Sequence, residues 1–230
     1  MYVIALIAFF HELFLSLEVK ELTSFYMALS FMLLMYWVSP WNVFLFSRTF
    51  TEDVIKFVDV GLWNVKILQK VRFKVRYTPQ VYFNVAGFAI PTSIAVYLTY
   101  VALKEGLITT TLYMTTLAFL TLTYNRLSKI AKGNGIFIPI ISSISITTAL
   151  MIMLSTHLSL SVSKAFILTY SLSCLASTLG IDILNLRSIA VYKSKYVVIG
   201  GYNLKDALIV IPALSSLTVK AVLSAIAYGI

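Results

Sequence analysis

The strongest constraint in this sequence is a series of apolar runs, most of them close to the length of a membrane span. A transmembrane helix needs roughly 20 apolar residues to cross a hydrocarbon layer about 30 Å thick. Of the 230 residues, 60% are hydrophobic and 12% are charged, whereas about a quarter of a soluble domain is charged. We therefore expect an all-α membrane protein with about seven transmembrane helices, forming a single polytopic domain over residues 1–230. The runs and their breaks predict spans at 2–19, 23–46, 82–103, 107–125, 136–156, 163–186 and 206–229.

The prolines and the amino-terminal run refine this prediction. Pro40, Pro91, Pro139 and Pro212 all fall inside apolar runs. We expect kinks, with Pro91 and Pro139 in first turns, where proline has less effect. The run MYVIALIAFFHELFLSL lacks the basic segment and small-residue cleavage site of a secretory signal, so we expect it to stay attached as the first span.

The positions of the cations predict the orientation of the chain. Three loops on one predicted face are basic, while the opposite loops carry only Lys20, Lys104 and Lys164. Because basic loops stay in the cytoplasm, we expect a multi-pass protein of the cell membrane with its amino terminus inside and its carboxyl terminus outside. The net charge of +9 is then explained by the lipid bilayer as partner, and no nucleic acid is expected. The cations of the basic loops are Arg48, Lys56, Lys66, Lys70, Arg72, Lys74 and Arg76, then Arg126, Lys129 and Lys132, then Arg187, Lys193 and Lys195.

Two basic segments have the pattern of strands. Apolar and basic residues alternate from Val71 to Tyr77, and Val191–Ile199 is rich in β-branched and aromatic residues. We expect both to form a small β-rich cytoplasmic patch, in which they could pair at the membrane surface. The alternative is two solvated basic loops that contact anionic lipid headgroups.

The sequence predicts no metal and no cofactor. Cys174 is the single cysteine, and His11 and His157 are the two histidines. A Cys/His metal site needs three or four such ligands held together.

Four segments carry a resemblance to a known family. They are VRYTPQVYFNVAGFAIP at 75–91, GNGIFIPIISSI at 133–144, TLGIDILNL at 178–186 and VIGGYNLKDALIVIPAL at 198–214. Together they resemble the uncharacterised prokaryotic multi-pass membrane family called domain of unknown function sixteen-fourteen. The resemblance implies a shared fold and motif set rather than a function. We expect the motif residues Gly180, Asn185, Gly200 and Gly201 to be binding positions beside two aspartates. This chain departs from the family pattern at residues 202–205 and at Ala207, where the family has glycine.

Ionisable residues inside spans are candidate functional residues, because each costs roughly 2.5–3.5 kcal/mol to insert. Asp182 lies near the end of the sixth predicted span and Asp206 opens the seventh. We expect the two carboxyls to meet near the inner face as a tentative catalytic pair. Two carboxyls sharing one proton can activate water against an amide, which is intramembrane aspartyl-protease chemistry on a membrane-protein or peptide substrate. This layout resembles the presenilin and signal-peptide-peptidase group, although the compact G-x-G-D motif is missing.

Three other roles for the same residues stay open. Asp206 could cap the last helix while Asp182 and Asn185 bond to neighbouring helices. The carboxylates could form a proton or ion site in a secondary transporter or channel-like protein. The chain could also be a non-catalytic membrane assembly or lipid-binding factor.

A second ionisable pair is expected deeper in the membrane. Glu12 and Lys220 lie roughly 17 and 21 Å from the inner ends of their spans. At these similar depths we expect a structural ion pair between the first and last helices. His11 could relay protons, but a hydrogen bond to a hydroxyl is the simpler expectation.

Overall fold

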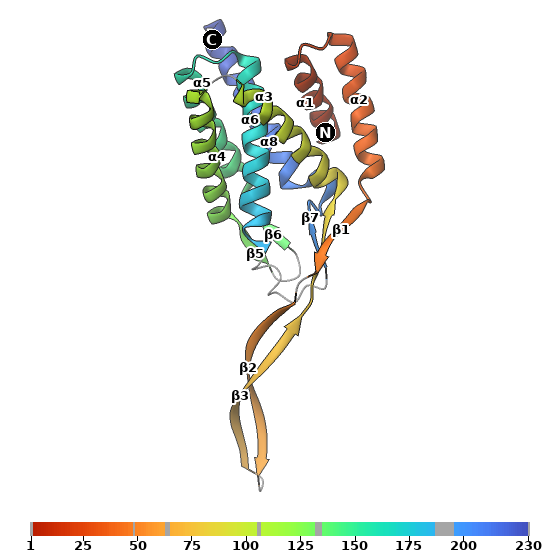
Figure 1. Cartoon of the computed structure of the whole chain (residues 1–230), viewed down its shortest axis with the longest axis vertical. Coiled ribbons are helices and arrows are strands. Elements are labelled where there is room, and N and C mark those ends of the chain that lie inside the picture. Colours follow the sequence, from red (N-terminus) through yellow and green to blue (C-terminus); the bar gives the residue numbers. More distant parts are fainter. Residues whose placement is uncertain are drawn as a thin grey trace.

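The computed structural model describes residues 2–47, 49–62, 65–104, 107–131, 135–186 and 196–229. Helices form a body from which one long β-hairpin projects (Figure 1), and we call the end of the body that carries it the hairpin end. The α-helices in these ranges are α1 (Tyr2–Ser16), α2 (Glu21–Val38), α3 (Ile90–Leu103), α4 (Leu107–Leu127), α5 (Ile140–His157), α6 (Val162–Ser177) and α8 (Ala207–Tyr228). The π-helix η1 (Val85–Ala89) precedes α3, and the π-helix η2 (Thr178–Ile183) follows α6. The short 3-10 helix η3 (Asn203–Lys205) precedes α8.

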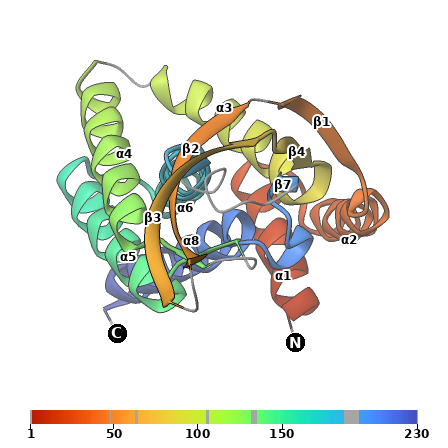
Figure 2. The same cartoon turned by 90° about the horizontal axis from the view of Figure 1, so that it is seen from below.

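Helix α6 lies at the centre of the body. It contacts α1, α3, α4, α5 and α8, which surround it when the molecule is seen along its long axis (Figure 2). Its side chains are accordingly buried over most of its length. Helix α6 is therefore the element on which any site inside the body depends.

Four helical segments within the described ranges are long and apolar enough to cross a membrane: Glu21–Val38, Ile140–His157, Val162–Ile183 and Ala207–Tyr228. Large apolar side chains such as Leu22, Leu33 and Ile141 lie on the outside of the body. An apolar outer surface is stable against lipid and unstable against water. The prediction of a helical membrane protein is confirmed, with four candidate membrane-crossing helices identified among the described residues where seven were predicted.

The predicted span boundaries are wrong in three places. Residues 42–46 of the second span, 82–84 of the third and 136–137 of the fifth are strands. Helix α2 ends at Val38, with Ser39 as its C-cap, so Pro40 lies beyond the helix and does not kink it. A proline has no N–H to continue a helix, and the aromatic and β-branched residues that follow favour extended backbone. Pro212 does lie inside α8, as expected.

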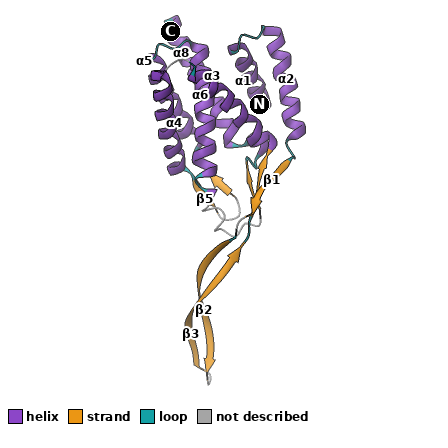
Figure 3. Cartoon of the chain, in the orientation of Figure 1, coloured by secondary structure: helices purple, strands orange, loops and turns teal. Residues whose placement is uncertain are grey.

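The strands form three small sheets (Figure 3). In one sheet β4 (Gln80–Asn84) lies between β1 (Asn42–Ser47), which is antiparallel to it, and β7 (Tyr196–Ile199), which is parallel to it. The hairpin is the antiparallel pair β2 (Phe50–Leu62) and β3 (Val65–Tyr77), in register from Phe50↔Tyr77 to Leu62↔Val65. A third pair, β5 (Lys129–Ala131) with β6 (Gly135–Phe137), closes the connection from α4 to α5.

The strand prediction is confirmed for 71–77 and for 196–199, whereas residues 191–195 lie outside the described residues. The expected pairing of these two segments with each other is wrong. Strand β3 pairs with β2, the segment immediately before it in the chain, and β7 pairs with β4. Hairpin closure is local and therefore costs less loop entropy than a distant pairing.

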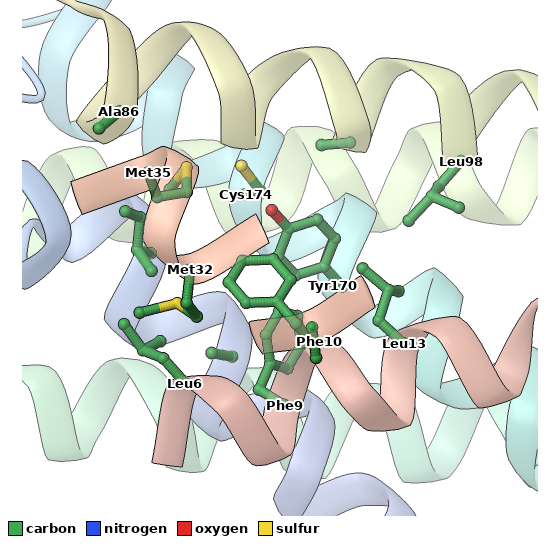
Figure 4. Close-up of a cluster of buried hydrophobic side chains, with 14 of the residues drawn as sticks. Leu6, Phe9, Phe10, Leu13, Met32, Met35, Ala86, Leu98, Tyr170 and Cys174 are labelled. Carbon is green, nitrogen blue, oxygen red and sulfur yellow. The ribbon is translucent and has the colours of Figure 1, made fainter. Parts of the chain in front are cut away.

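An aromatic cluster joins α1 and α2 to the rest of the body (Figure 4). The rings of Phe9 and Tyr170 lie 5.1 Å apart between centroids, and Phe9 and Phe10 lie 5.0 Å apart. Met32 and Met35 of α2 fill the space beside them. This cluster fixes α1 against the central helix α6.

Candidate functional site

The motif residues predicted as a site lie at the hairpin end, where α6 passes into the π-helix η2. Gly180 in η2 packs against the last turns of α4, and a Cβ atom there would lie 2.4 Å from the backbone oxygen of Thr121. The side-chain amide of Asn125 donates to the Gly180 carbonyl over 3.1 Å. Gly180 is thus required for close contact between η2 and α4, and its predicted binding role remains a proposal.

Asn185 holds the end of η2 in place. Its Nδ2 atom donates to the carbonyl oxygens of Gly180 and Ile181 and, over 2.8 Å, to the hydroxyl of Ser128. Carbonyls at the end of a helix have no partner within the helix. The Asn185 amide supplies one and ties η2 to the end of α4.

Asp182 stands in the middle of this ordered segment. Its Oδ2 atom is buried and has no hydrogen-bond partner among the described residues, while the residue as a whole is half-buried. Asp182 and Asp206 both lie at the hairpin end of the body, one in η2 and the other at the start of α8. An unpartnered carboxyl oxygen inside a protein is costly, and π-helical turns are frequent at functional sites. Asp182 is therefore the residue of this region that packing does not explain.

Asp206 has a clear structural role. It is the N-cap of α8, and its Oδ1 atom accepts from the Leu208 N–H over 3.1 Å while Oδ2 accepts from the Tyr202 N–H over 3.2 Å. The residue precedes the apolar segment Ala207–Tyr228 and is buried. Burial raises the pKa of its carboxyl above the ordinary value, and the two N–H donors act in the opposite direction.

The glycine pair 200–201 forms the turn that brings β7 back toward α8. Gly200 has φ +69°, and a Cβ atom there would lie 2.6 Å from the backbone carbon of Gly87 in η1. Gly87 is itself fixed, because its N–H donates to the Asn84 side chain over 2.7 Å. A side chain on Gly200 would separate the two units that lie side by side here, β4 with η1 and β7 with η3. Packing therefore accounts for Gly200, and Gly201 lies next to it on the exposed side of the turn.

Buried hydroxyl groups extend from this region into the body along α6. The Tyr124 hydroxyl is hydrogen-bonded to Thr147 and lies 3.3 Å from the Ser173 Oγ. Farther along, the Tyr113 hydroxyl lies 2.6 Å from Thr99 Oγ1 and 3.1 Å from Ser171 Oγ. Five more hydroxyls are buried and have no hydrogen-bond partner within the described part of the chain, those of Thr121, Thr148, Ser155, Ser177 and Ser215.

Four of these five unpartnered hydroxyls lie at one level. Thr121 belongs to α4, Thr148 to α5, Ser177 to α6 and Ser215 to α8. A rise of 1.5 Å per residue puts each of them roughly 8 to 12 Å from the hairpin end. Four helices therefore each contribute a buried hydroxyl at a similar distance from the hairpin end.

The second ionisable pair lies away from this region. Lys220 Nζ forms a salt bridge with Glu12 Oε2, linking α8 to α1. In the neighbouring residue His11, the Nδ1 atom lies 2.7 Å from the hydroxyl of Ser24, which is the hydrogen bond to a hydroxyl that the sequence led us to expect. Within the described ranges, no group of three or more Cys, His, Asp or Glu side chains could hold a metal ion.

The apolar helices, the buried carboxyl beside η2 and the hydroxyl-rich interior define a helical integral membrane protein. The chain belongs to the family described as protein of unknown function (DUF1614), whose model matches residues 37–218. No curated protein and no solved structure matches the chain. The match covers Asp182 and Asp206 but neither Glu12 nor Lys220, so the salt bridge joins two residues outside the family region. The family match gives no support to the presenilin-like similarity.

The residues that sequence reasoning missed are mainly hydroxyls. Ser and Thr in runs such as TTTLYMTT and SSISITT are common in membrane helices, where they bond to their own backbone, so their position along the chain does not reveal which ones face the interior. Asn84 and Asn125 were also missed as contacts of Gly87 and Gly180, although Asn84 and Gly87 stand in a motif that the family resemblance includes.

Proposed function

We propose that the protein couples proton movement to a membrane process, with Asp182 as the group that binds and releases the proton. The observation that carries this proposal is the buried Oδ2 atom of Asp182, which has no partner among the described residues and lies in a segment apolar enough to cross a membrane. Carboxyls in such positions are typical of proton relays and coupled transporters, because burial favours the neutral form and a nearby charge can reverse this.

The hydroxyl-rich interior supports a path for the proton. Hydroxyl groups both donate and accept hydrogen bonds, so paired hydroxyls and the waters between them can pass a proton along a chain. The chain we infer starts at Asp182, passes the level of Thr121, Ser177 and Ser215, and continues by Ser173 and Ser171 toward the far end of the body. Buried polar groups without a protein partner are the positions where ordered water binds.

Peptide hydrolysis by Asp182 and Asp206 is the second candidate. It is favoured by the position of the two carboxyls at the hairpin end of the neighbouring segments α6–η2 and α8. Against it, both oxygens of Asp206 already accept backbone N–H groups that hold the start of α8. A carboxyl with that capping role is poorly suited to reorient around a substrate amide.

Proton flux into liposomes tests the proposal directly. The full chain is reconstituted with a pH-sensitive dye inside, a pH gradient is applied, and potassium with valinomycin clamps the membrane potential. We expect flux above that of empty liposomes for the wild type and for Asp53→Asn, a control carboxyl exposed on the hairpin. We expect Asp182→Asn to lose the flux while keeping its helical circular dichroism spectrum and a monodisperse elution profile.

A second variant and a second substrate make the result decisive. The double variant Thr121→Val with Ser177→Ala keeps Asp182 and should slow the flux. Equal flux in the wild type and Asp182→Asn, or none in folded wild type, would overturn the proposal. Cleavage of a reporter transmembrane peptide, lost equally in Asp182→Asn and Asp206→Asn, would establish the hydrolase instead.

A further inference from the structure

The β2–β3 hairpin carries a row of exposed cations that the proposed function does not use. Lys70, Arg72, Lys74 and Arg76 of β3 are all exposed, and their alternate positions put them on one face of the ribbon. From β2, the described side chains on this face are Thr51, opposite Arg76, and Asp53, opposite Lys74. This part of the ribbon therefore has a strongly basic face.

On the opposite face, the side chains that β3 itself contributes are apolar. Val71 and Val75 are half-buried, and Phe73 between them is 44% exposed. The two faces together give β3 a strict alternation of cation and apolar side chain from 70 to 76. An exposed aromatic residue within such a row is typical of a contact surface.

One edge of β3 is open to a further strand. Within the described residues the hairpin is a two-stranded sheet, in which β3 pairs with β2 alone. The outer edge of β3 therefore presents backbone N–H and C=O groups without a strand partner. Such an edge is a template for strand addition.

The direction of the hairpin argues against lipid headgroups as the partner of all four cations of β3. The hairpin extends away from the helical body along the long axis of the molecule (Figure 1), and at about 3.4 Å per residue Lys70 lies roughly 20 Å beyond Arg76. Exposed charges are screened beyond about 8 Å at physiological ionic strength. A membrane surface at the base of the hairpin would therefore act on the nearest cations and leave the others unpaired.

Nucleic acid matches only one of the two faces. Phosphates would pair with the cations, but Val71, Phe73 and Val75 would stay exposed to water. A protein strand added to the open edge places its own side chains alternately on both faces. It satisfies the cations with carboxylates and covers the apolar row with apolar side chains.

We propose that the open edge of β3 binds an extended segment of a partner protein in which acidic and apolar residues alternate. Backbone hydrogen bonds along the edge supply the affinity, and the alternation fixes the register, because a shift by one residue would bring acids onto the apolar face. This inference is independent of the proton proposal, since it rests on residues outside the helical body.

Fluorescence anisotropy of a labelled peptide tests this proposal with the full chain in nanodiscs of zwitterionic lipid. The probe is a short synthetic peptide in which Glu and Val alternate. The first control peptide has the same composition with all Glu residues in one block. The second keeps the alternation but is N-methylated at every other residue, which removes the N–H donors of one edge. We expect the alternating peptide to bind most tightly, and the Kd to rise with salt.

A charge-matched pair of protein variants locates the site. Replacing Lys70, Arg72 and Lys74 by Gln should abolish binding, and Phe73→Ser should weaken it. Replacing Lys20, Lys104 and Lys164 by Gln removes the same charge at the other end of the body and should leave the Kd unchanged. Equal binding of the block or N-methylated peptide would overturn strand addition. Tighter binding of a single-stranded RNA, or binding that requires anionic lipid, would overturn the choice of a protein partner.

Discussion

Replacing Gly180 by alanine is the most direct test of the site architecture. The added methyl group would lie 2.4 Å from the backbone oxygen of Thr121 and 3.1 Å from the Tyr124 Cβ. Ordinary contact requires about 1 Å more, so α4 and η2 must move apart, and overpacking of this kind costs about 1–3 kcal/mol. The movement also lengthens the two hydrogen bonds that join these segments, from Asn125 to the Gly180 carbonyl and from Asn185 to the Ser128 hydroxyl, each worth about 1 kcal/mol. We expect Gly180→Ala to lower the free energy of unfolding by about 2–4 kcal/mol.

Reversible unfolding in mixed dodecyl maltoside and SDS micelles, followed by circular dichroism, measures this loss. Gly135→Ala serves as the control, because nothing lies within 4 Å of its Cβ position and only its φ of +91° opposes the change. We expect it to cost about 1–2 kcal/mol. The obstacle at Gly180 is a backbone oxygen, so adding Thr121→Ala should not restore stability. A loss below about 0.5 kcal/mol for Gly180→Ala, or rescue by Thr121→Ala, would refute the reasoning.

Three further predictions concern the ion pair, the cap and the glycine turn. Glu12→Gln and Lys220→Met should each lower the free energy of unfolding by about 2–3 kcal/mol, because each leaves one charge alone among apolar helices. The double variant should regain most of this loss, and purely additive losses in the double-mutant cycle would contradict a coupled pair. Asp206→Ala should cost about 0.5–2 kcal/mol of unfolding free energy through loss of the N-cap, with Asn retaining most of it. Since burial raises the pKa of Asp206 in the folded state, the folded protein binds more protons than the unfolded chain at pH values between the unfolded and the folded pKa of this carboxyl. The free energy of unfolding should therefore fall as pH rises through this window, and Asp206→Asn should flatten its dependence on pH. Gly200→Ala should lower the thermal unfolding midpoint more than Gly201→Ala, because Gly200 combines φ +69° with backbone contact to η1, and equal shifts would argue against close packing there.

The sequence was most informative where one physical pattern dominates. Apolar runs predicted the seven long α-helices of the described residues, and the alternation from Val71 to Tyr77 predicted the strand character of β3. The boundaries near Pro40 could not be obtained from hydropathy, because Val43 and Phe46 are as apolar as a span. Which strands pair also depends on tertiary structure, and only the local pairs β2–β3 and β5–β6 follow from chain proximity.

The candidate site was predictable in its residues and not in their contacts. Asp182 and Asp206 stand out because charges are rare in apolar runs. Their different environments, an unpartnered oxygen in one and two backbone donors in the other, follow from η2 and from the turn after β7. Neither element has a reliable sequence signal. The buried hydroxyls escaped prediction because helix packing alone decides which Ser and Thr residues face inward.

The three-stranded sheet at the hairpin end has a mechanical consequence. Strand β1 precedes β2 and β4 follows β3, so both legs of the hairpin run into this sheet, and β4 is bonded there to β7. Strand β7 in turn leads through the Gly200 turn to the capped start of α8. A force on the strands of the hairpin would thus act through an arm about 40 Å long. The three-stranded sheet at the base of the arm would pass this force through β7 and the Gly200 turn to the first turn of α8.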